Sequence, residues 1–191
     1  MNKARLEAFS DGVIAILITI MVLDLKVPHG RDWAALAMLL PVFLSYALSF
    51  IFLGIYWNNH HHMLHATTRI NGKILWANLH LLFWLSLVPF TTAWMGEQRS
   101  APVPTAVYGM VFLLSAGAWL ILQHAIIAHE GKDSKLSLAM GKDVKGKTSA
   151  GLYVLGVVLA FIYPWIADAL YVSVALLWLV PDRRIESLFK G

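Results

Sequence analysis

The stretch RLEAFSDGVIAILITIMVLDLKV at residues 5–27 places polar side chains directly before an apolar run that begins at Val13. The polar side chains are those of Arg5, Glu7, Ser10 and Asp11. A continuous apolar run of this length is typical of a membrane-spanning helix. Because Asp11 interrupts the charged start and no small-residue cleavage site follows, the sequence predicts a retained first span and no signal peptide.

The composition of the whole chain supports the same class of protein. The chain has 191 residues, of which 59% are hydrophobic and 14% charged, and its mean hydropathy is +0.66. The hydrophobic fraction is higher, and the charged fraction lower, than is usual for soluble domains. The length leaves no room for a soluble domain beside the spans, so residues 1–191 are predicted to form a single transmembrane domain. The chain contains no cysteine, which excludes disulfides and thiolate chemistry.

Six apolar runs, separated by Pro, Gly, Asn and charged residues, predict an all-α integral membrane protein with six transmembrane helices. The runs are Val13–Val27, Trp33–Trp57, Ile74–Met95, Val103–Ile127, Ala150–Ile166 and Ala167–Val180. The separation of the last two depends on Pro164 and Asp168, and the alternative is one kinked helix. No filter-like TVGYG segment occurs, so a re-entrant pore loop is not expected.

The distribution of Lys and Arg predicts the orientation. With six spans, one side receives Lys3, Arg5, Arg69, Lys73, Lys132, Lys135, Lys142, Lys145, Lys147, Arg183, Arg184 and Lys190, and the other receives Lys26, Arg31 and Arg99. Cytoplasmic loops carry the excess of positive charge, so both termini are predicted to be cytoplasmic. The same topology accounts for the net charge of +4 without a nucleic-acid partner. The expected location is the plasma membrane.

The apolar part of the first span carries a stripe in which Ile16, Ile20 and Leu23 recur at helical spacing, with Thr19 beside them. Such a stripe packs against lipid, against another helix or against symmetry-related copies, and periodicity alone does not choose between them. It is also the pattern of a hydrophobic constriction in a pore.

Histidines gather at the end of the second span, at His60, His61, His62 and His65. The spacing of His61 and His65 suits a zinc pair on one helical face, but the HExxH glutamate is missing, which argues against a metal-dependent hydrolase. Two interpretations are favoured: neutral imidazoles that hydrogen-bond polar groups of the first span, or interfacial residues without a special role. Asn78 lies inside the third apolar run and also needs a partner there. Nucleotide-binding and hydrolase motifs are absent, so an enzyme is not expected.

Arg5, Phe9, Ser10 and Asp11 form an R-x-x-x-F-S-D motif that resembles the signature of the prokaryotic transmembrane protein 175 family of potassium channels. Trp57, His60 and His61 resemble the family's W-x-x-H-H segment. The N-L pair at Asn78 and Leu79 and the P-F pair at Pro89 and Phe90 are similar to further family motifs. The resemblance covers essentially the whole chain.

The resemblance implies a homotetramer in which the first helix of each subunit lines a central pathway for potassium. It implies a pore constriction at Ile16, Ile20 and Leu23, and a hydroxyl layer linked to selectivity at Thr19. It further implies a polar network that holds the pore helix and joins Arg5, Ser10 and Asp11 to Trp57, His60, His61 and Asn78. No cofactor and no tightly bound metal are implied, with K⁺ only permeant near Ile16 and Thr19. His62 and His65 extend beyond the family pattern.

Two other function classes remain open at this point. A proton-coupled secondary transporter would use the histidines of the second span and would show saturable, pH-driven uptake. A membrane scaffold would show neither uptake nor currents. The leading hypothesis is passive conduction by a potassium-selective cation channel.

Overall fold

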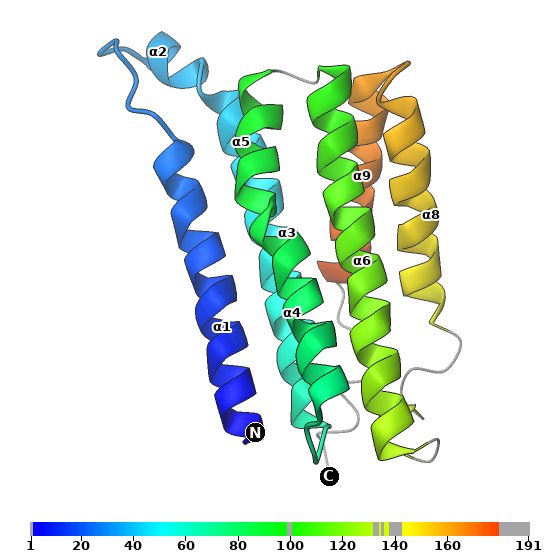
Figure 1. The fold of residues 1–191 in the computed structure, drawn as a ribbon. Helices are drawn as coiled ribbons and strands as arrows, with labels where there is room; N and C mark the ends of the chain where they lie inside the picture. The colour runs from blue at the N-terminus through cyan, green and yellow to red at the C-terminus, as the bar shows by residue number, and fades with distance from the viewer. Residues whose placement is uncertain (1, 99–100, 132–133, 135, 138–142, 180–191) are drawn as a thin grey trace.

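The computed structural model describes residues 2–98, 101–131, 134, 136–137 and 143–179, and these residues form helices without any strand. The helices lie side by side in one bundle (Figure 1). In chain order they are α1 (Lys3–Ile20), the 3₁₀ helix η1 (Met21–Asp24), α2 (Trp33–Ala37), α3 (Leu40–His65), α4 (Gly72–Ser86), α5 (Val88–Glu97), α6 (Pro102–Glu130), α8 (Val144–Leu159) and α9 (Pro164–Leu179).

Four stretches of the described chain are long and apolar enough to cross a membrane. They are Lys3–Asp24, Leu40–His65, Gly72–Glu97 and Pro102–Glu130. These stretches overlap the first four predicted spans. The helices α8 and α9 have 16 residues each, about 24 Å at 1.5 Å per residue, which is shorter than the hydrocarbon core of about 30 Å. The multi-pass class is therefore established, and the count of six spans stays a prediction.

The last two apolar runs are two separate helices and not one kinked helix. The helix α8 ends at Leu159 and α9 begins at Pro164 after a turn. The two helices pack along each other. The break lies a few residues earlier than the hydropathy pattern indicated, because Pro164 begins α9, where its missing N–H costs no helical hydrogen bond.

Polar and proline residues determine where several helices begin. Asn2, Asp32, Asn71 and Asp143 cap α1, α2, α4 and α8 by accepting hydrogen bonds from backbone N–H groups of the first turn. Pro89 stands at the start of α5. Since proline cannot donate a backbone hydrogen bond, the third predicted span is interrupted at Leu87 and continues as α5.

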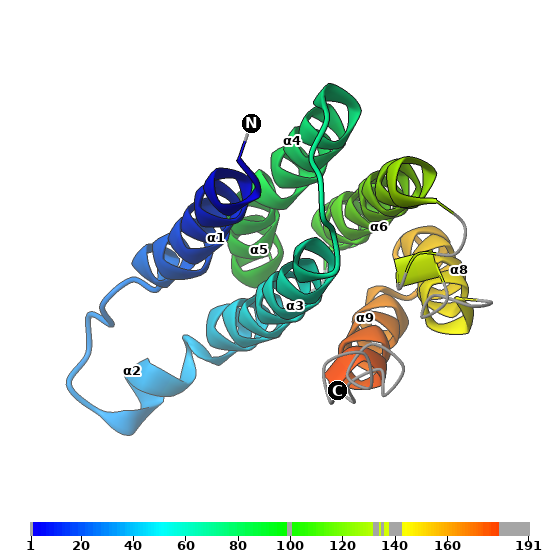
Figure 2. The same cartoon turned by 90° about the horizontal axis from the view of Figure 1, so that it is seen from below.

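The packing places α1 at one edge of the bundle. Viewed from below, α1 and α2 lie on one side, α8 and α9 lie on the other, and α3 runs between them (Figure 2). The helix α1 contacts α3, α4 and α5, while α4 packs along α6 and α3 along α5. The described residues therefore leave one flank of α1 uncovered.

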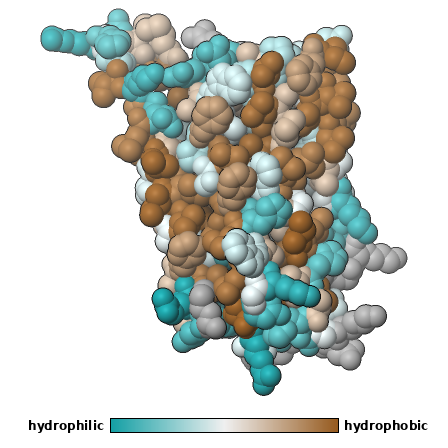
Figure 3. All heavy atoms as spheres, in the orientation of Figure 1, coloured by the Kyte–Doolittle hydropathy of each residue, from teal (hydrophilic) through white to brown (hydrophobic). Residues whose placement is uncertain are grey.

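Hydrophobic side chains cover the middle of the face seen in Figure 3, and hydrophilic side chains gather at its two ends. Lys3, Arg69 and Lys73 lie near the end where α1 begins, and Lys26 and Arg31 follow the other end of α1. The Lys26 amine donates a 2.6 Å hydrogen bond to Glu97 Oε1, which raises the pKa of Lys26 above its ordinary value. The remaining basic residues of the orientation prediction, apart from Arg5, Lys145 and Lys147, lie outside the described residues: Arg99, Lys132, Lys135, Lys142, Arg183, Arg184 and Lys190.

Candidate functional site

The two faces of α1 have opposite surroundings. One face is buried against the neighbouring helices and consists of Leu6, Ser10, Ile14, Leu17 and, in η1, Met21. The residues of the predicted stripe lie on the other face: Ile16 is 61% exposed, Ile20 45% and Leu23 77%. No described residue of the chain thus buries the stripe, and it is available to lipid or to another copy of the protein.

Thr19 lies on the same exposed face as Ile16 and Ile20. Its hydroxyl donates to the backbone carbonyls of Ala15 and Ile16, both at 3.0 Å. A hydroxyl has one proton and two lone pairs, so this back-bonding uses the donor and leaves the oxygen able to accept. Among Val, Ile and Leu neighbours, Thr19 therefore offers an oxygen to a cation that approaches the face.

A buried chain of side-chain hydrogen bonds connects α1 to α4 and α3. Asn78 Nδ2 donates to Ser10 Oγ at 2.9 Å, and Asn78 Oδ1 lies 2.7 Å from His60 Nε2. Ser10 Oγ in turn donates to the carbonyl of Leu6 at 2.9 Å. Ser10 and Asn78 are fully buried and His60 is 1% exposed. Such side chains avoid the cost of burying unpaired polar groups only while they stay together.

The direction of these hydrogen bonds assigns the histidine tautomer. Because a carboxamide oxygen only accepts, His60 Nε2 carries the proton that it donates to Asn78. His60 Nδ1 is buried and has no hydrogen-bond partner among the described residues. His60 therefore donates to Asn78, and Asn78 in turn donates to Ser10 on α1.

A second contact between α1 and α3 lies nearer to the surface. Trp57 Nε1 donates to Asp11 Oδ1 at 3.1 Å, and Trp57 is 46% exposed. The ring of His61 stacks on Trp57 with a centroid distance of 6.4 Å. His61 thus reaches the polar cluster through ring contact, whereas Asp11 and Trp57 are joined directly.

The structure brings together Ser10, Asp11, Trp57, His60 and Asn78, and it does not bring Arg5 or Phe9 into that cluster. Arg5 is exposed, and Phe9 is 52% exposed. Both lie on the uncovered flank of α1 with Ile16. These exposures are those of a single chain. A second copy packed on this flank would cover both side chains.

A second buried hydrogen-bond chain was not predicted. Thr92 Oγ1 donates to Ser49 Oγ at 2.7 Å, and Ser49 Oγ lies 2.9 Å from Tyr108 Oη. These residues connect α5, α3 and α6 and are buried. Isolated Ser and Thr residues in apolar helices are common, so no sequence pattern distinguishes this cluster. The residues that the structure describes contain no group of three His, Cys, Asp or Glu side chains able to hold a metal ion.

Comparisons with known proteins place these features in a group of channels. The family model described as the endosomal/lysosomal potassium channel TMEM175 matches residues 5–89. A potassium channel of Chryseobacterium sp. (strain P1-3) is 55% identical over 190 residues, which cover 100% of this chain and 99% of that protein. A potassium channel of Streptomyces collinus is 39% identical over 131 residues, 64% of each chain.

A solved structure extends the similarity to three dimensions. The crystal structure of a lysosomal potassium-selective channel TMEM175 homolog from Chamaesiphon minutus superposes with a TM-score of 0.81 at 30% sequence identity. The superposition covers 94% of this chain and 97% of that one. The similarity therefore extends over nearly the whole length of both chains.

Proposed function

Because the chain belongs to the TMEM175 family, we propose that it is a potassium-selective channel that conducts K⁺ passively across the plasma membrane. The observation that carries the proposal is the uncovered face of α1, where Ile16, Thr19, Ile20 and Leu23 are exposed in the single chain. A channel requires neither a catalytic residue nor a cofactor, and K⁺ is the permeant ion.

The proposed assembly is a homotetramer in which four copies of α1 surround a central axis. The position of α1 at the edge of the bundle supports this assembly, because the helix can meet its copies without rearrangement of α3 or α4 (Figure 2). The residues that would line the axis are Ile16, Ile20 and Leu23. Arg5 and Phe9, on the same flank, would lie at the entrance of the pathway.

The physical basis for gating is dehydration. A ring of Ile16 and Ile20 side chains would form a narrow apolar segment, where removing water from a cation costs several kcal/mol or more unless polar atoms replace it. Thr19 supplies such an atom, since its hydroxyl oxygen remains free to accept. Without a cage of backbone carbonyls, the selectivity for K⁺ over Na⁺ should be moderate.

The polar cluster behind α1 would act as a positioning device. Ser10, Asn78 and His60 hold the buried face of α1, and Trp57 holds Asp11, the next residue along α1. Since helix rotation by one residue moves a side chain by about 100°, this fixed register determines which residues reach the axis. The cluster therefore supports the proposed role of Ile16 and Ile20.

We also propose the topology of the sequence prediction: six spans in one domain of residues 1–191, with both termini in the cytoplasm. The four long apolar stretches support it. The position of Lys3, Arg69 and Lys73 at the end where α1 begins agrees with the positive-inside rule. The helices α8 and α9 would complete the bundle as the two shorter spans.

The decisive experiment is single-channel recording of the purified protein in planar bilayers, with K⁺ on one side and Na⁺ on the other. We expect unitary currents whose reversal potential is displaced toward the K⁺ equilibrium potential. Saturable uptake driven by a pH gradient, without unitary currents and lost when His60, His61 and His62 are replaced, would instead establish the proton-coupled transporter. Folded protein with neither activity would support a scaffold.

A further inference from the structure

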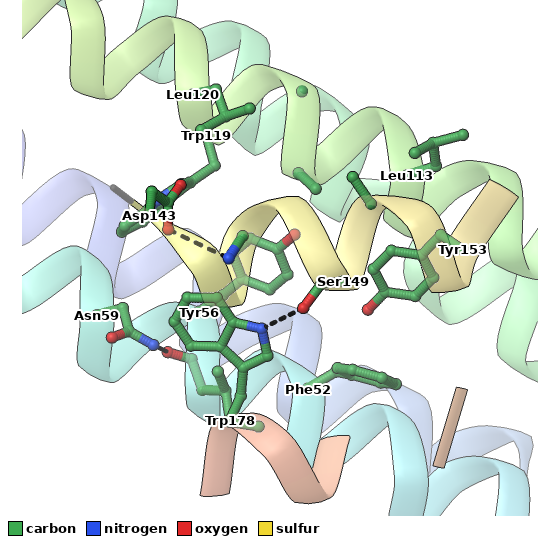
Figure 4. Close-up of a pocket in the computed structure, with 15 residues that line it drawn as sticks. Phe52, Tyr56, Asn59, Leu113, Trp119, Leu120, Asp143, Ser149, Tyr153 and Trp178 are labelled. Atoms are coloured by element: carbon green, nitrogen blue, oxygen red, sulfur yellow. Dashed lines mark hydrogen bonds between the residues drawn. The ribbon is translucent and has the colours of Figure 1, made fainter. Parts of the chain in front are cut away.

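A second site lies on the opposite side of the bundle from the uncovered face of α1. A cavity of about 170 Å³ opens between α3, α6, α8 and α9 (Figure 4). Its wall is mainly apolar, and five of its residues are aromatic: Phe52, Tyr56, Trp119, Tyr153 and Trp178. None of these residues belongs to the proposed pore helix, so the cavity is separate from the ion pathway.

The wall of the cavity is held by hydrogen bonds. Trp178 Nε1 donates to Ser149 Oγ at 2.8 Å, which joins α9 to α8. Asn59 Nδ2 donates to the carbonyl of Ile55 at 2.9 Å, so its carboxamide oxygen stays available as an acceptor. The rings of Phe52 and Tyr153 also pack together, with centroids 6.2 Å apart. The cavity is therefore preformed, as ligand sites usually are.

The polar groups of the cavity favour positive charge. Among the described lining residues, Asp143 is the one with a charged side chain, and one of its oxygens accepts from Gly146 N at 3.1 Å. The faces of aromatic rings attract cations. Trp178 already attracts one, since Lys145 Nζ lies 5.9 Å from its ring centroid. Lys145 itself does not line the cavity, so an anionic ligand such as a fatty acid would meet a carboxylate and the negative faces of the rings there.

We propose that this cavity binds a small organic cation, a quaternary ammonium or amine attached to a single aromatic ring. The ring would lie among Phe52, Tyr153 and Trp178, and the charge would face Asp143 and the oxygen of Asn59. The size agrees with this ligand class, because a protein cavity of about 150 Å³ accommodates one benzene ring. The cavity is not fully enclosed, which leaves room for the charged group.

Isothermal titration of the full chain in nanodiscs tests the proposal directly. The probe is benzyltrimethylammonium, whose charge does not depend on pH, and the comparison compound is neopentylbenzene, which has nearly the same shape without the charge. We expect the cation to bind about tenfold more tightly than the neutral compound. This measurement does not require conduction, so it stands apart from the channel hypothesis.

Two variants locate the site. Asp143→Asn keeps the helix cap, because asparagine also caps, and it should weaken binding of the cation about tenfold without a change in melting temperature. Gly117→Leu should abolish binding of both compounds by filling the cavity, since a Cβ at Gly117 meets no atom within 4 Å. Gly151→Leu is the matched control, because that glycine on α8 is equally open and does not line the cavity.

The outcomes separate this site from the pore and from a purely apolar pocket. Unchanged binding in Gly117→Leu would overturn the proposal. If binding were lost in Ile16→Asn as well as unchanged in Gly117→Leu, the ligand would lie on α1. Equal affinity for the charged and neutral compounds, together with no effect of Asp143→Asn, would overturn the assignment to a cation. Loss in Gly117→Leu with retention in Gly151→Leu and Ile16→Asn would support it.

Discussion

Asn78 Nδ2 on α4 donates a 2.9 Å hydrogen bond to Ser10 Oγ on α1, and both side chains are fully buried. The same carboxamide accepts from His60 on α3, so one side chain joins three helices. A polar side chain at this depth has no water to replace a lost partner. The buried face of α1 is therefore hydrogen-bonded to a residue of a different helix, whereas the stripe lies on the other, exposed face.

The first prediction concerns this junction. Asn78→Leu leaves the His60 Nε2–H group without an acceptor, and the expected loss is about 1–3 kcal/mol of stability. Because α1 also loses its register, we expect altered unitary conductance in the fraction that folds. Thermal unfolding in detergent and single-channel recording measure the two effects. Asn58→Leu on the exposed face of α3 is the control and should leave both unchanged.

The second prediction concerns the proposed constriction. Ile16→Asn introduces a polar side chain on the exposed stripe, so the apolar segment should become wet and the conductance should rise several-fold. The fold should be kept, because Ile16 is 61% exposed in the single chain. Ile121→Asn makes the same change on α6, at a side chain that is 51% exposed. Equal effects of the two variants on conductance would remove Ile16 from the gate.

The third prediction concerns selectivity at Thr19. Thr19→Val preserves the shape of the side chain and removes its only oxygen, so we expect a smaller preference for K⁺ over Na⁺. The measurement is the reversal potential in mixed K⁺ and Na⁺ solutions. Thr19→Ser keeps the hydroxyl and should behave like the original chain. If Thr19→Val and the original chain share one reversal potential, the hydroxyl takes no part in selectivity.

The fourth prediction concerns the packing of α9. Tyr171 Oη donates to the carbonyl of Thr105 at 3.2 Å, and its ring lies against Gly109 of α6 and Gly156 of α8. A methyl group at either glycine would overlap Tyr171, so Gly109→Ala or Gly156→Ala should cost about 1–3 kcal/mol of stability.

The matched control for those two variants is Gly54→Ala on α3, where a Cβ meets no atom within 4 Å. It should be neutral or stabilising by up to about 1 kcal/mol, because alanine is the better helix former. Unfolding temperatures of the three variants check the prediction. A similar melting temperature for all three would show that the contact between Tyr171 and the glycines is not tight.

The membrane class was readable from local sequence, and the reason is physical. In a bilayer each spanning segment must satisfy its own backbone hydrogen bonds. The length and hydropathy of α1, α3 and α6 therefore suffice to predict each of these helices separately. Asn71 and Pro102, where α4 and α6 begin, also lie at the breaks between the predicted apolar runs, whereas α1 begins at Lys3, well before the first predicted run at Val13. The break at Leu87 and the 3₁₀ turn at Met21–Asp24 were not predicted, because hydropathy continues through both.

The family resemblance indicated which residues belong to the polar cluster, but it did not indicate which of them pair with each other. Ser10, His60 and Asn78 prove to form one hydrogen-bonded chain, and Asp11 pairs with Trp57. His61 shares ring contacts only. Pairing depends on which rotamers meet across a helix interface, and no spacing within a single helix contains that information.

By itself, the sequence determined that this chain is a membrane protein, that polar side chains precede its first apolar run, and that this run presents apolar side chains on every side. Only the tertiary structure decided that Ile14 and Leu17 face the bundle whereas Ile16 and Ile20 do not. All four are apolar, so periodicity treats them alike. What distinguishes them is the presence of α3 and α4 against one face of α1. Whether a residue is buried therefore depends on how the helices pack and not on the residue type.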